Sequence, residues 1–413
     1  MKRRVVVTGL GIVTPLSCNV ADCWTRIVAG ESGIHQAATL DTKRMRVTIA
    51  GDVGDWDPSG YIEKREINRI DRFTQFSIVA TADAVRDACI DFSSIDPFRC
   101  GVIVGSGIGG LNTIHTQMEK LILKGPERVS PLTIPKLMLN AAGGNLSIRY
   151  GLRGPNFSVA TACASATNAM GSAFEVIRNG VIDMCVTGGS EAAVTPISLS
   201  AFGNMRALSE RNDDPEKASR PFDRDRDGFV LSEGAGTLIF EELEHAVARG
   251  ATIYGEVIGY GATGDAGHIT QPAEDGVGAA KAMQAALDDA GIRPEEVDYI
   301  NAHGTSTPLG DKAETIALKS VFGDHAYKLS ISSTKSQIGH SLGASGGIEA
   351  VFSLKALNDN KVPPTINLDT PDPDCDLDYT PNVAKDRELN VALSNSFGFG
   401  GHNACIMFRK VAE

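Results

Sequence analysis

Short apolar runs that end in glycine or serine alternate with longer amphipathic segments along most of this chain. Short runs of this kind predict buried strands. The longer segments, whose apolar positions recur every three to four residues, predict helices. Regular alternation of the two is typical of a sheet covered by helices. The hydrophobic pattern therefore predicts an α/β fold.

Three pairs of similar segments occur in the same order in two parts of the chain. The pairs are residues 4–11 with 255–261, 101–107 with 297–304, and 157–163 with 329–335. A shared order of this kind predicts an internal duplication, with one half at 1–250 and the other at 251–413. The first half is longer, and its prolines and charged runs place the excess around 111–150 and 194–230.

Composition narrows the class of protein. The chain has 413 residues and a net charge of −12, which argues against nucleic acid as the main partner. Its eight cysteines form no CxxC pair and most lie in apolar runs, as reduced core residues of a reducing compartment do. No apolar stretch approaches the roughly 20 residues that a membrane span needs, and no apolar signal region follows the basic N-terminus. We expect a soluble, cytoplasmic protein.

Cys163 stands at a junction between a predicted strand and a helix rich in small residues. The positive end of a helix favours a thiolate, so we expect the pKa of this thiol to be lowered. His303 and His340 lie far downstream, each close to a glycine that allows the chain to approach closely. A thiol nucleophile with two imidazoles predicts acyl-transfer chemistry.

Residues 105–110 match the pattern GxGxxG, which is also found in dinucleotide-binding proteins. The segment follows a predicted strand, but no acidic residue stands about 20 positions further on, as that fingerprint requires. We therefore reject a nucleotide site at this loop.

Four motifs occur in a fixed order: TACAS at 161–165, NAHGTSTPLGD at 301–311, STKSQIGH at 333–340 and NSFGFGG at 395–401. With them the chain resembles the β-ketoacyl-acyl carrier protein (ACP) synthases over essentially its whole length, and synthase II in particular. The resemblance implies a thiolase-like fold of duplicated βαβαβαββ halves in a five-layer αβαβα arrangement. It also implies a homodimer without membrane insertion and without a cofactor.

The reaction that the resemblance implies is a decarboxylative Claisen condensation. An acyl group moves from ACP to Cys163, and malonyl-ACP then loses CO2. The resulting carbanion attacks the thioester to give β-ketoacyl-ACP. His303 and His340 match the pair that stabilises the enolate, and Lys335 matches a buried organiser that pairs with Glu349.

The resemblance also assigns groups that bind the substrate. The oxyanion hole matches the backbone N–H groups of Cys163 and Phe399, and Phe399 matches a gate to the acyl pocket. Ile108 matches a residue that lines this pocket. Hydroxyls that contact pantetheine match Thr270, Thr305 and Thr307. A structural cation site matches Asn301, Glu349, Ser394 and Asn395.

ACP is strongly acidic, so an acidic enzyme needs a local basic surface to bind it. Four basic residues fall at near-helical spacing and predict one face of a helix: Lys64, Arg65, Arg69 and Arg72. Further candidates for the docking surface are Lys120, Lys124, Arg128 and Arg206.

Other functions share some of these features. A synthase I or a polyketide ketosynthase would use the same chemistry. A degradative thiolase would need a second catalytic cysteine near the C-terminal glycine loop, whereas Cys405 lies beyond that loop in a strand-like run. A non-catalytic chain-length partner would lack the nucleophile. A cysteine hydrolase on another fold would release free acid instead of a ketoacyl product.

Overall fold

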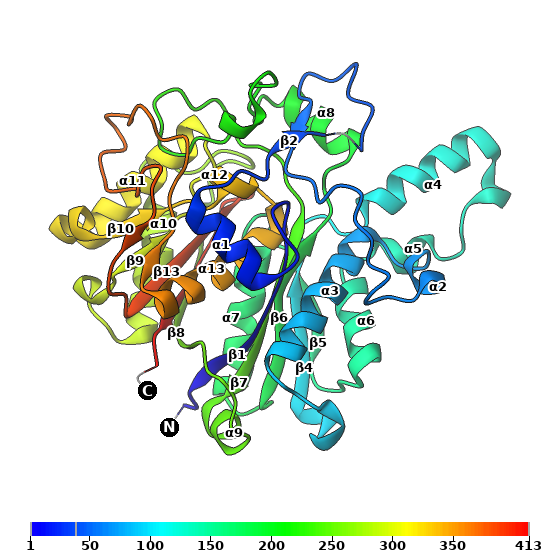
Figure 1. The fold of residues 1–413 in the computed structure, drawn as a ribbon, viewed down its shortest axis with the longest axis horizontal. Helices are drawn as coiled ribbons and strands as arrows, with labels where there is room; N and C mark the ends of the chain where they lie inside the picture. The colour runs from blue at the N-terminus through cyan, green and yellow to red at the C-terminus, as the bar shows by residue number, and fades with distance from the viewer. Residues whose placement is uncertain (1, 38, 412–413) are drawn as a thin grey trace.

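A mixed sheet of ten strands organises the molecule (Figure 1). The computed structural model describes residues 2–37 and 39–411. The strand order is β10-β9-β13-β14-β8-β1-β7-β6-β4-β5. The strands are β1 (Val5–Val13), β4 (Cys100–Gly105), β5 (Asn156–Val159), β6 (Met184–Glu191), β7 (Gly234–Glu242), β8 (Gly255–Gly264), β9 (Tyr299–Asn301), β10 (Ser330–Ser332), β13 (Val391–Gly398) and β14 (His402–Arg409). The central strands β1 and β8 pair antiparallel and join the two parts of the sheet.

Helices cover this sheet and also lie between its two parts. They are α1 (Val20–Ala29), α2 (Lys64–Ile67), α3 (Arg72–Asp87), α4 (Leu111–Lys124), α5 (Thr133–Leu137), α6 (Ala141–Tyr150), α7 (Ser165–Arg178), α8 (Pro196–Asn204), α9 (Leu243–Ala248), α10 (Val277–Ala290), α11 (Pro308–Phe322), α12 (Lys335–Ile338) and α13 (Ser345–Asp359). Two small antiparallel sheets of two strands complete the fold: β2 (His35–Gln36) with β3 (Ile49–Ala50), and β11 (Lys361–Val362) with β12 (Lys385–Asp386).

The predicted duplication is visible in the order of the elements. The first part runs β1-α3-β4-α6-β5-α7-β6-β7, and the second runs β8-α10-β9-α11-β10-α13-β13-β14. Helices α7 and α13 contact strands of both parts and form the middle layer. Figure 1 shows α3 and α6 on one side of the molecule and α10 and α11 on the other. The α/β class and the five-layer arrangement of βαβαβαββ halves are confirmed.

The expected insertions are only partly correct. Helices α4 and α5 are additions to the repeated unit, as is the segment from α8 to β7, but α6 lies within the range 111–150 and belongs to the unit itself. The segment from α1 to α2 between β1 and α3 was not anticipated. Prolines and charges indicate where an insertion departs from the sheet. They do not indicate where the chain returns to it.

The middle layer contains small residues because it lies between the two parts of the sheet. Helix α7 contacts β8, and a Cβ at Gly171 would lie 2.3 Å from the ring of Tyr260. Glycine at this position therefore lets the two halves approach each other. The carboxyl ends of the parallel strands in both halves then meet at one edge, where ligand sites of α/β proteins form.

Candidate active site

The nucleophile candidate lies in a strained turn between β5 and α7. The residue before it, Ala162, has a positive φ of 49°. Ser165, the first residue of α7, accepts a hydrogen bond from the N–H of Thr161 and donates one to the carbonyl of Ala162. These contacts hold the turn and direct Cys163, which is 7% exposed, into a cavity between the halves.

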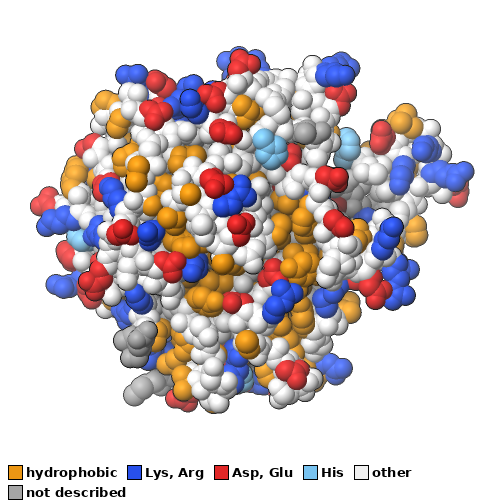
Figure 2. Space-filling model, in the orientation of Figure 1, with side chains coloured by type: hydrophobic (Ala, Val, Ile, Leu, Met, Phe, Trp, Pro, Cys, Tyr) orange, Lys and Arg blue, Asp and Glu red, His pale blue; other side chains and the backbone are white. Residues whose placement is uncertain are grey.

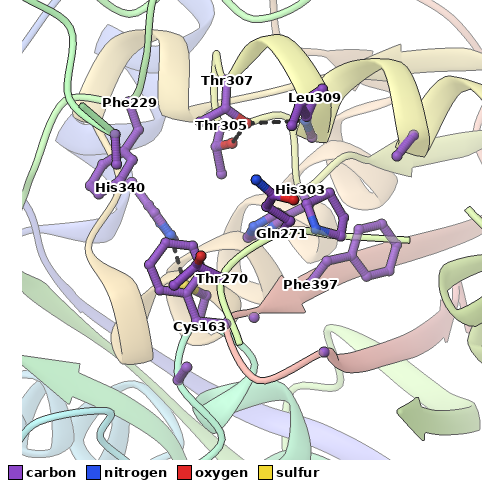
Figure 3. A pocket seen from close by; sticks show the side chains of 18 of the residues that line it. Cys163, Phe229, Thr270, Gln271, His303, Thr305, Thr307, Leu309, His340 and Phe397 are labelled. Carbon is purple, nitrogen blue, oxygen red and sulfur yellow. Dashed lines mark hydrogen bonds between the residues drawn. The ribbon is translucent and has the colours of Figure 1, made fainter. Parts of the chain in front are cut away.

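Cys163, His303 and His340 come together although 177 residues separate the first from the last. The Nε2 atom of His340 lies 3.0 Å from Sγ of Cys163, and one ligand atom from each of the three residues falls within 4.8 Å of the others. The two imidazole rings meet edge to face, with centroids 5.4 Å apart. Figure 3 shows His340 and His303 on two sides of the cavity, with a dashed line between His340 and the thiol of Cys163.

Both imidazoles are neutral at physiological pH. Burial lowers the pKa of His303 and of His340 well below the ordinary value, and the positive charge of Lys335 lowers both further. Each ring can therefore donate one N–H without carrying a charge. A thiol and two imidazoles also suit zinc, but the ammonium of Lys335, which acts on all three groups, disfavours a second cation there.

The expected lowering of the Cys163 pKa is wrong. Burial raises the pKa of this thiol to about 11, although the charge of Lys335 and the backbone N–H of Phe399 oppose the rise. The cost of removing the thiolate from water is therefore larger than its stabilisation by the N-terminus of α7. That stabilisation is typically below about 1 kcal/mol. The raised pKa favours the thiol form of Cys163 in the protein without substrate.

Lys335 opens α12 and is 1% exposed. Its ammonium pairs with the carboxylate of Glu349 on α13. A buried charge needs a partner of this kind, since an unpaired one would be strongly destabilising. The pair supplies a fixed positive charge behind the two imidazoles.

The cavity has a volume of about 540 Å³. Ile108 and Phe399 line it, as do the predicted pantetheine contacts Thr270, Thr305 and Thr307. The hydroxyls of Thr305 and Thr307 lie 3.1 Å apart above the thiol (Figure 3), whereas Thr307 also caps the first turn of α11. The residues that were matched to the family motifs thus line one cavity.

The glycine loop after β13 approaches the nucleophile backbone closely. A Cβ at Gly398 would lie 2.8 Å from the carbonyl oxygen of Thr161 and 3.0 Å from the backbone nitrogen of Cys163. Only glycine fits between these segments. The close approach brings the N–H of Phe399 within hydrogen-bonding reach of the Cys163 sulfur.

Three of the four residues matched to a cation site have buried polar atoms without a hydrogen-bond partner among the described residues. These atoms are the amide group of Asn301, Oε2 of Glu349 and the hydroxyl of Ser394. Oxygen atoms with unused lone pairs are what a hard cation requires. The side chain of Asn395 instead donates to Glu314 and accepts from Cys405. The first three residues fit a cation, and the side chain of Asn395 does not.

Two buried carboxylates that sequence reasoning missed organise the loops of the site. Glu191, at the end of β6, accepts N–H groups from Gly107, Ile108 and Gly343, at 2.7 to 3.1 Å. Glu314 on α11 accepts the N–H of His303 at 2.9 Å. Both are fully buried, and neither is paired with a cation in the described residues.

Glu191 also argues against a phosphate site at residues 105–110. Its carboxylate occupies the amide groups that a nucleotide would need. A glutamate 80 to 90 residues away in sequence gives no local signal, because its contacts depend on how β4 and β6 pair.

The basic residues do not form one helix face. Lys64 and Arg65 belong to the short helix α2, Arg69 follows it, and all three are exposed. Arg72 begins α3 and turns inward, where it pairs with Glu233 at 2.8 Å. Arg206 is exposed at the lining of the cavity. Figure 2 shows Lys and Arg side chains gathered on the projecting arm formed by α4, which carries Lys120 and Lys124.

Cys405 lies away from this cavity. It is fully buried in β14, where its thiol contacts Asn395. A second catalytic cysteine is therefore not provided by this residue.

Comparison with known proteins gives a consistent result. Residues 2–246 match the model of the beta-ketoacyl synthase N-terminal domain, and residues 254–369 match that of the C-terminal domain. The 3-oxoacyl-[acyl-carrier-protein] synthase 2 of Synechocystis sp. is 50% identical over 409 residues, which cover 99% of this chain and 98% of the relative.

Two solved structures superimpose over the full length of this chain and of their own. A beta-ketoacyl synthase from Burkholderia phymatum has a TM-score of 0.93 and 35% sequence identity. A complex of a type II PKS (polyketide synthase) acyl-carrier protein with its ketosynthase contains a chain with a TM-score of 0.91 and 36% identity.

The raised pKa of Cys163 predicts how the free enzyme reacts with an alkylating agent. Only the thiolate reacts, so the rate of modification by iodoacetamide should rise about tenfold per pH unit between pH 6.5 and 9.5. Peptide mass spectrometry would follow modification at Cys163 itself, with the exposed Cys89 as an internal reference. A rate that levels off above pH 7 would show instead that the N-terminus of α7 lowers the pKa of Cys163 by more than burial raises it.

Proposed function

The chain belongs to the β-ketoacyl synthase family, and on that premise we propose that its cavity joins an acyl chain to a malonyl unit in fatty acid elongation. It is a condensing acyltransferase of the synthase 2 type, and ACP delivers both substrates. The observation that carries the proposal is the buried group of one thiol and two neutral imidazoles. This set suits the formation of a thioester followed by the formation of an enolate.

In the first half-reaction, Cys163 attacks the acyl thioester. The Sγ–acyl bond forms, the bond to the pantetheine sulfur breaks, and the thiol proton passes to that departing sulfur. Negative charge develops on the carbonyl oxygen of the tetrahedral intermediate. The N–H groups of Cys163 and Phe399 would stabilise this charge, because hydrogen-bond donors fixed in advance are effective in a site without water.

In the second half-reaction, malonyl-ACP loses CO2 from the carbon next to its thioester. The electrons of the broken bond pass to the thioester oxygen as an enolate. His303 and His340 would each donate an N–H to this oxygen. Neutral donors suit the step because they stabilise the developing charge without first binding the malonyl carboxylate as an ion pair.

Condensation completes the cycle. The enolate carbon attacks the acyl group on Cys163, a carbon–carbon bond forms, and the thiolate of Cys163 leaves. Lys335 would favour this departure because its positive charge stabilises the thiolate. The product is β-ketoacyl-ACP, longer by two carbons, and the thiolate regains a proton before the next cycle.

Supporting roles are assigned in the same way. Ile108 would limit the acyl pocket, and Phe399 would gate it. Thr270, Thr305 and Thr307 would contact pantetheine at the cavity lining. A cation held by Asn301, Glu349 and Ser394 would steady the loops behind the histidines.

We further propose that the chain forms a homodimer. Strand β5 is the last strand of the sheet, and Phe157 on it is 41% exposed. The arm of α4 and α5 presents further apolar side chains, including Ile122 at 74% and Ile134 at 61%. An exposed strand edge and exposed apolar side chains are both typical of an interface. A second copy of this chain would cover both.

We place the enzyme in the cytoplasm. All eight cysteines are free thiols in the structure, which suits a reducing compartment. No helix in the described part of the chain is long and apolar enough to span a membrane.

The two halves, 1–250 and 251–413, would each contribute one set of loops to the site.

Polyketide synthesis is the second candidate, because the fold superimposes on that of a PKS ketosynthase complex at a TM-score of 0.91. The identity of 36% to that complex is lower than the 50% to the synthase 2 relative. Fatty acid elongation is therefore the better supported of the two.

A mass-resolved turnover assay tests the proposal. Acyl-ACP of six to sixteen carbons is supplied with malonyl-ACP, and the protein should release ketoacyl-ACP longer by two carbons together with CO2. Accumulation of chains with several unreduced keto groups would favour the polyketide alternative. Release of free acid alone would indicate a hydrolase, and the synthase proposal would fail.

The basic residues Lys64, Arg65 and Arg69 should contribute to the binding of ACP and not to the chemical steps at Cys163. Replacing all three with Glu should raise KM for acyl-ACP by about tenfold, because exposed ion pairs contribute up to about 1 kcal/mol each. Acylation of Cys163 by a small thioester without ACP should be unchanged.

A matched control replaces three exposed basic residues elsewhere, Lys2, Arg293 and Lys328, with Glu and so makes the same change in net charge. This variant should keep its KM for acyl-ACP at low salt. An equal rise in both variants would mean that net charge, and not a docking surface, determines the effect.

A further inference from the structure

A serine on α13 contacts the second catalytic imidazole from behind. The hydroxyl oxygen of Ser345 lies 3.0 Å from Nδ1 of His340, while Nε2 of the same ring faces Cys163. The hydroxyl of Ser341 lies 3.2 Å from that of Ser345. All four side chains are at most 7% exposed. No other partner of Nδ1 is present in the described part of the chain.

The direction of these hydrogen bonds follows from how many protons there are to place. Each serine hydroxyl has one proton and can accept as well as donate. If Ser341 donates to Ser345 and Ser345 donates to Nδ1, both hydroxyl protons are used and Nε2 donates the ring proton to the sulfur of Cys163. Only the S–H of Cys163, a weak donor, then has no acceptor at His340. In the opposite direction Nδ1–H donates to Ser345 and Ser345 to Ser341. The Ser341 proton then has no acceptor among the described residues, which is costly in a buried site.

We propose that Ser345 is a positioning residue that donates to Nδ1 of His340 and so fixes the tautomer with hydrogen on Nε2. This tautomer directs an N–H into the cavity at the sulfur of Cys163. The inference concerns the same site as the proposed function and rests on it for its catalytic consequence. The tautomer itself can be measured without any substrate.

The position of Ser345 on its helix supports this role. It is the first residue of α13, and Glu349, one turn later, holds Lys335. Residues four apart lie on the same face of a helix, so one face of α13 positions both His340 and the lysine behind it. Ser165 begins α7, the matching helix of the first half, and holds the turn of Cys163. The duplicated helices thus both begin with a serine that organises the site.

The consequence for catalysis is specific. Stabilisation of the enolate requires an N–H at Nε2, and a ring with its proton on Nδ1 would instead place a lone pair against the developing negative charge. Without the hydroxyl of Ser345, the thiol of Cys163 can donate to Nε2, which favours the wrong tautomer. Replacement of Ser345 should therefore lower the rate of malonyl decarboxylation about 10- to 100-fold, the usual effect of removing a hydrogen-bond partner that orients a functional histidine.

The tautomer of His340 tests the proposal directly. Protein labelled with 15N-histidine would be studied by two-bond proton–nitrogen correlation at pH 7.5, and the His340→Asn variant would assign the signal. The wild-type protein should show hydrogen on Nε2. The Ser345→Ala variant should shift towards hydrogen on Nδ1. Hydrogen on Nδ1 in the wild type, or no change in Ser345→Ala, would overturn the proposal.

Activity gives the second readout. Ser345→Ala should lower kcat for decarboxylation and leave KM for malonyl-ACP unchanged, and Ser345→Thr should restore kcat because it keeps a hydroxyl. Ser353→Ala is the matched control, since Ser353 is a buried serine of the same helix that bonds only to the carbonyl of Glu349. It should leave the tautomer and kcat unchanged. Loss of kcat in Ser353→Ala as large as in Ser345→Ala would reduce Ser345 to a structural role.

These results separate the two proposals. A wild-type protein with hydrogen on Nε2 that nevertheless makes no ketoacyl product would contradict the proposed function and leave the role of Ser345 intact. Normal condensation by a wild-type protein with hydrogen on Nδ1 would contradict the role of Ser345 and support the proposed function.

Discussion

Removal of the two imidazoles from water is the constraint on which this site depends. Desolvation lowers the pKa of His303 and of His340 and so favours their neutral forms, and the same burial raises the pKa of Cys163. A single buried cation, Lys335, opposes the second effect and reinforces the first. Its ammonium pairs with the carboxylate of Glu349, and loss of one partner of such a buried pair typically costs about 3–5 kcal/mol.

The duplicated fold supplies these groups from both sides. Cys163 comes from the first half, and His303, Lys335 and His340 come from the second. Small residues in α7 and α13 allow the halves to approach until the carboxyl ends of their parallel strands meet. The buried carboxylates accept hydrogen bonds from backbone N–H groups of the loops around the site. Glu191 ties the loop of Ile108 to that of Gly343, and Glu314 fixes the turn of His303.

Much of this could be predicted from the sequence, because the duplication and four motifs leave strong local signals. The duplicated α/β organisation follows from the repeated segments, and the shared site of Cys163, His303 and His340 follows from the family resemblance that the motifs carry. The raised pKa of Cys163 could not be predicted, because a sequence shows where a helix starts but not how deeply the thiol is buried. Arg72 belongs to a charged run in sequence, yet α2 ends before it and its side chain packs inward. Glu191 and Ser345 act through contacts that exist only once the strands have paired and the halves have met.

The central claim is that two neutral imidazoles stabilise the enolate independently of the nucleophile. Decarboxylation of malonyl-ACP by the Cys163→Gln variant, with and without His303→Ala, tests it most directly. The account predicts release of CO2 and acetyl-ACP without condensation, at a rate that does not change between about pH 6 and 9, and a loss of at least about 100-fold when His303 is also replaced. A rate that titrates near pH 6.5, or one that survives His303→Ala, would contradict the account.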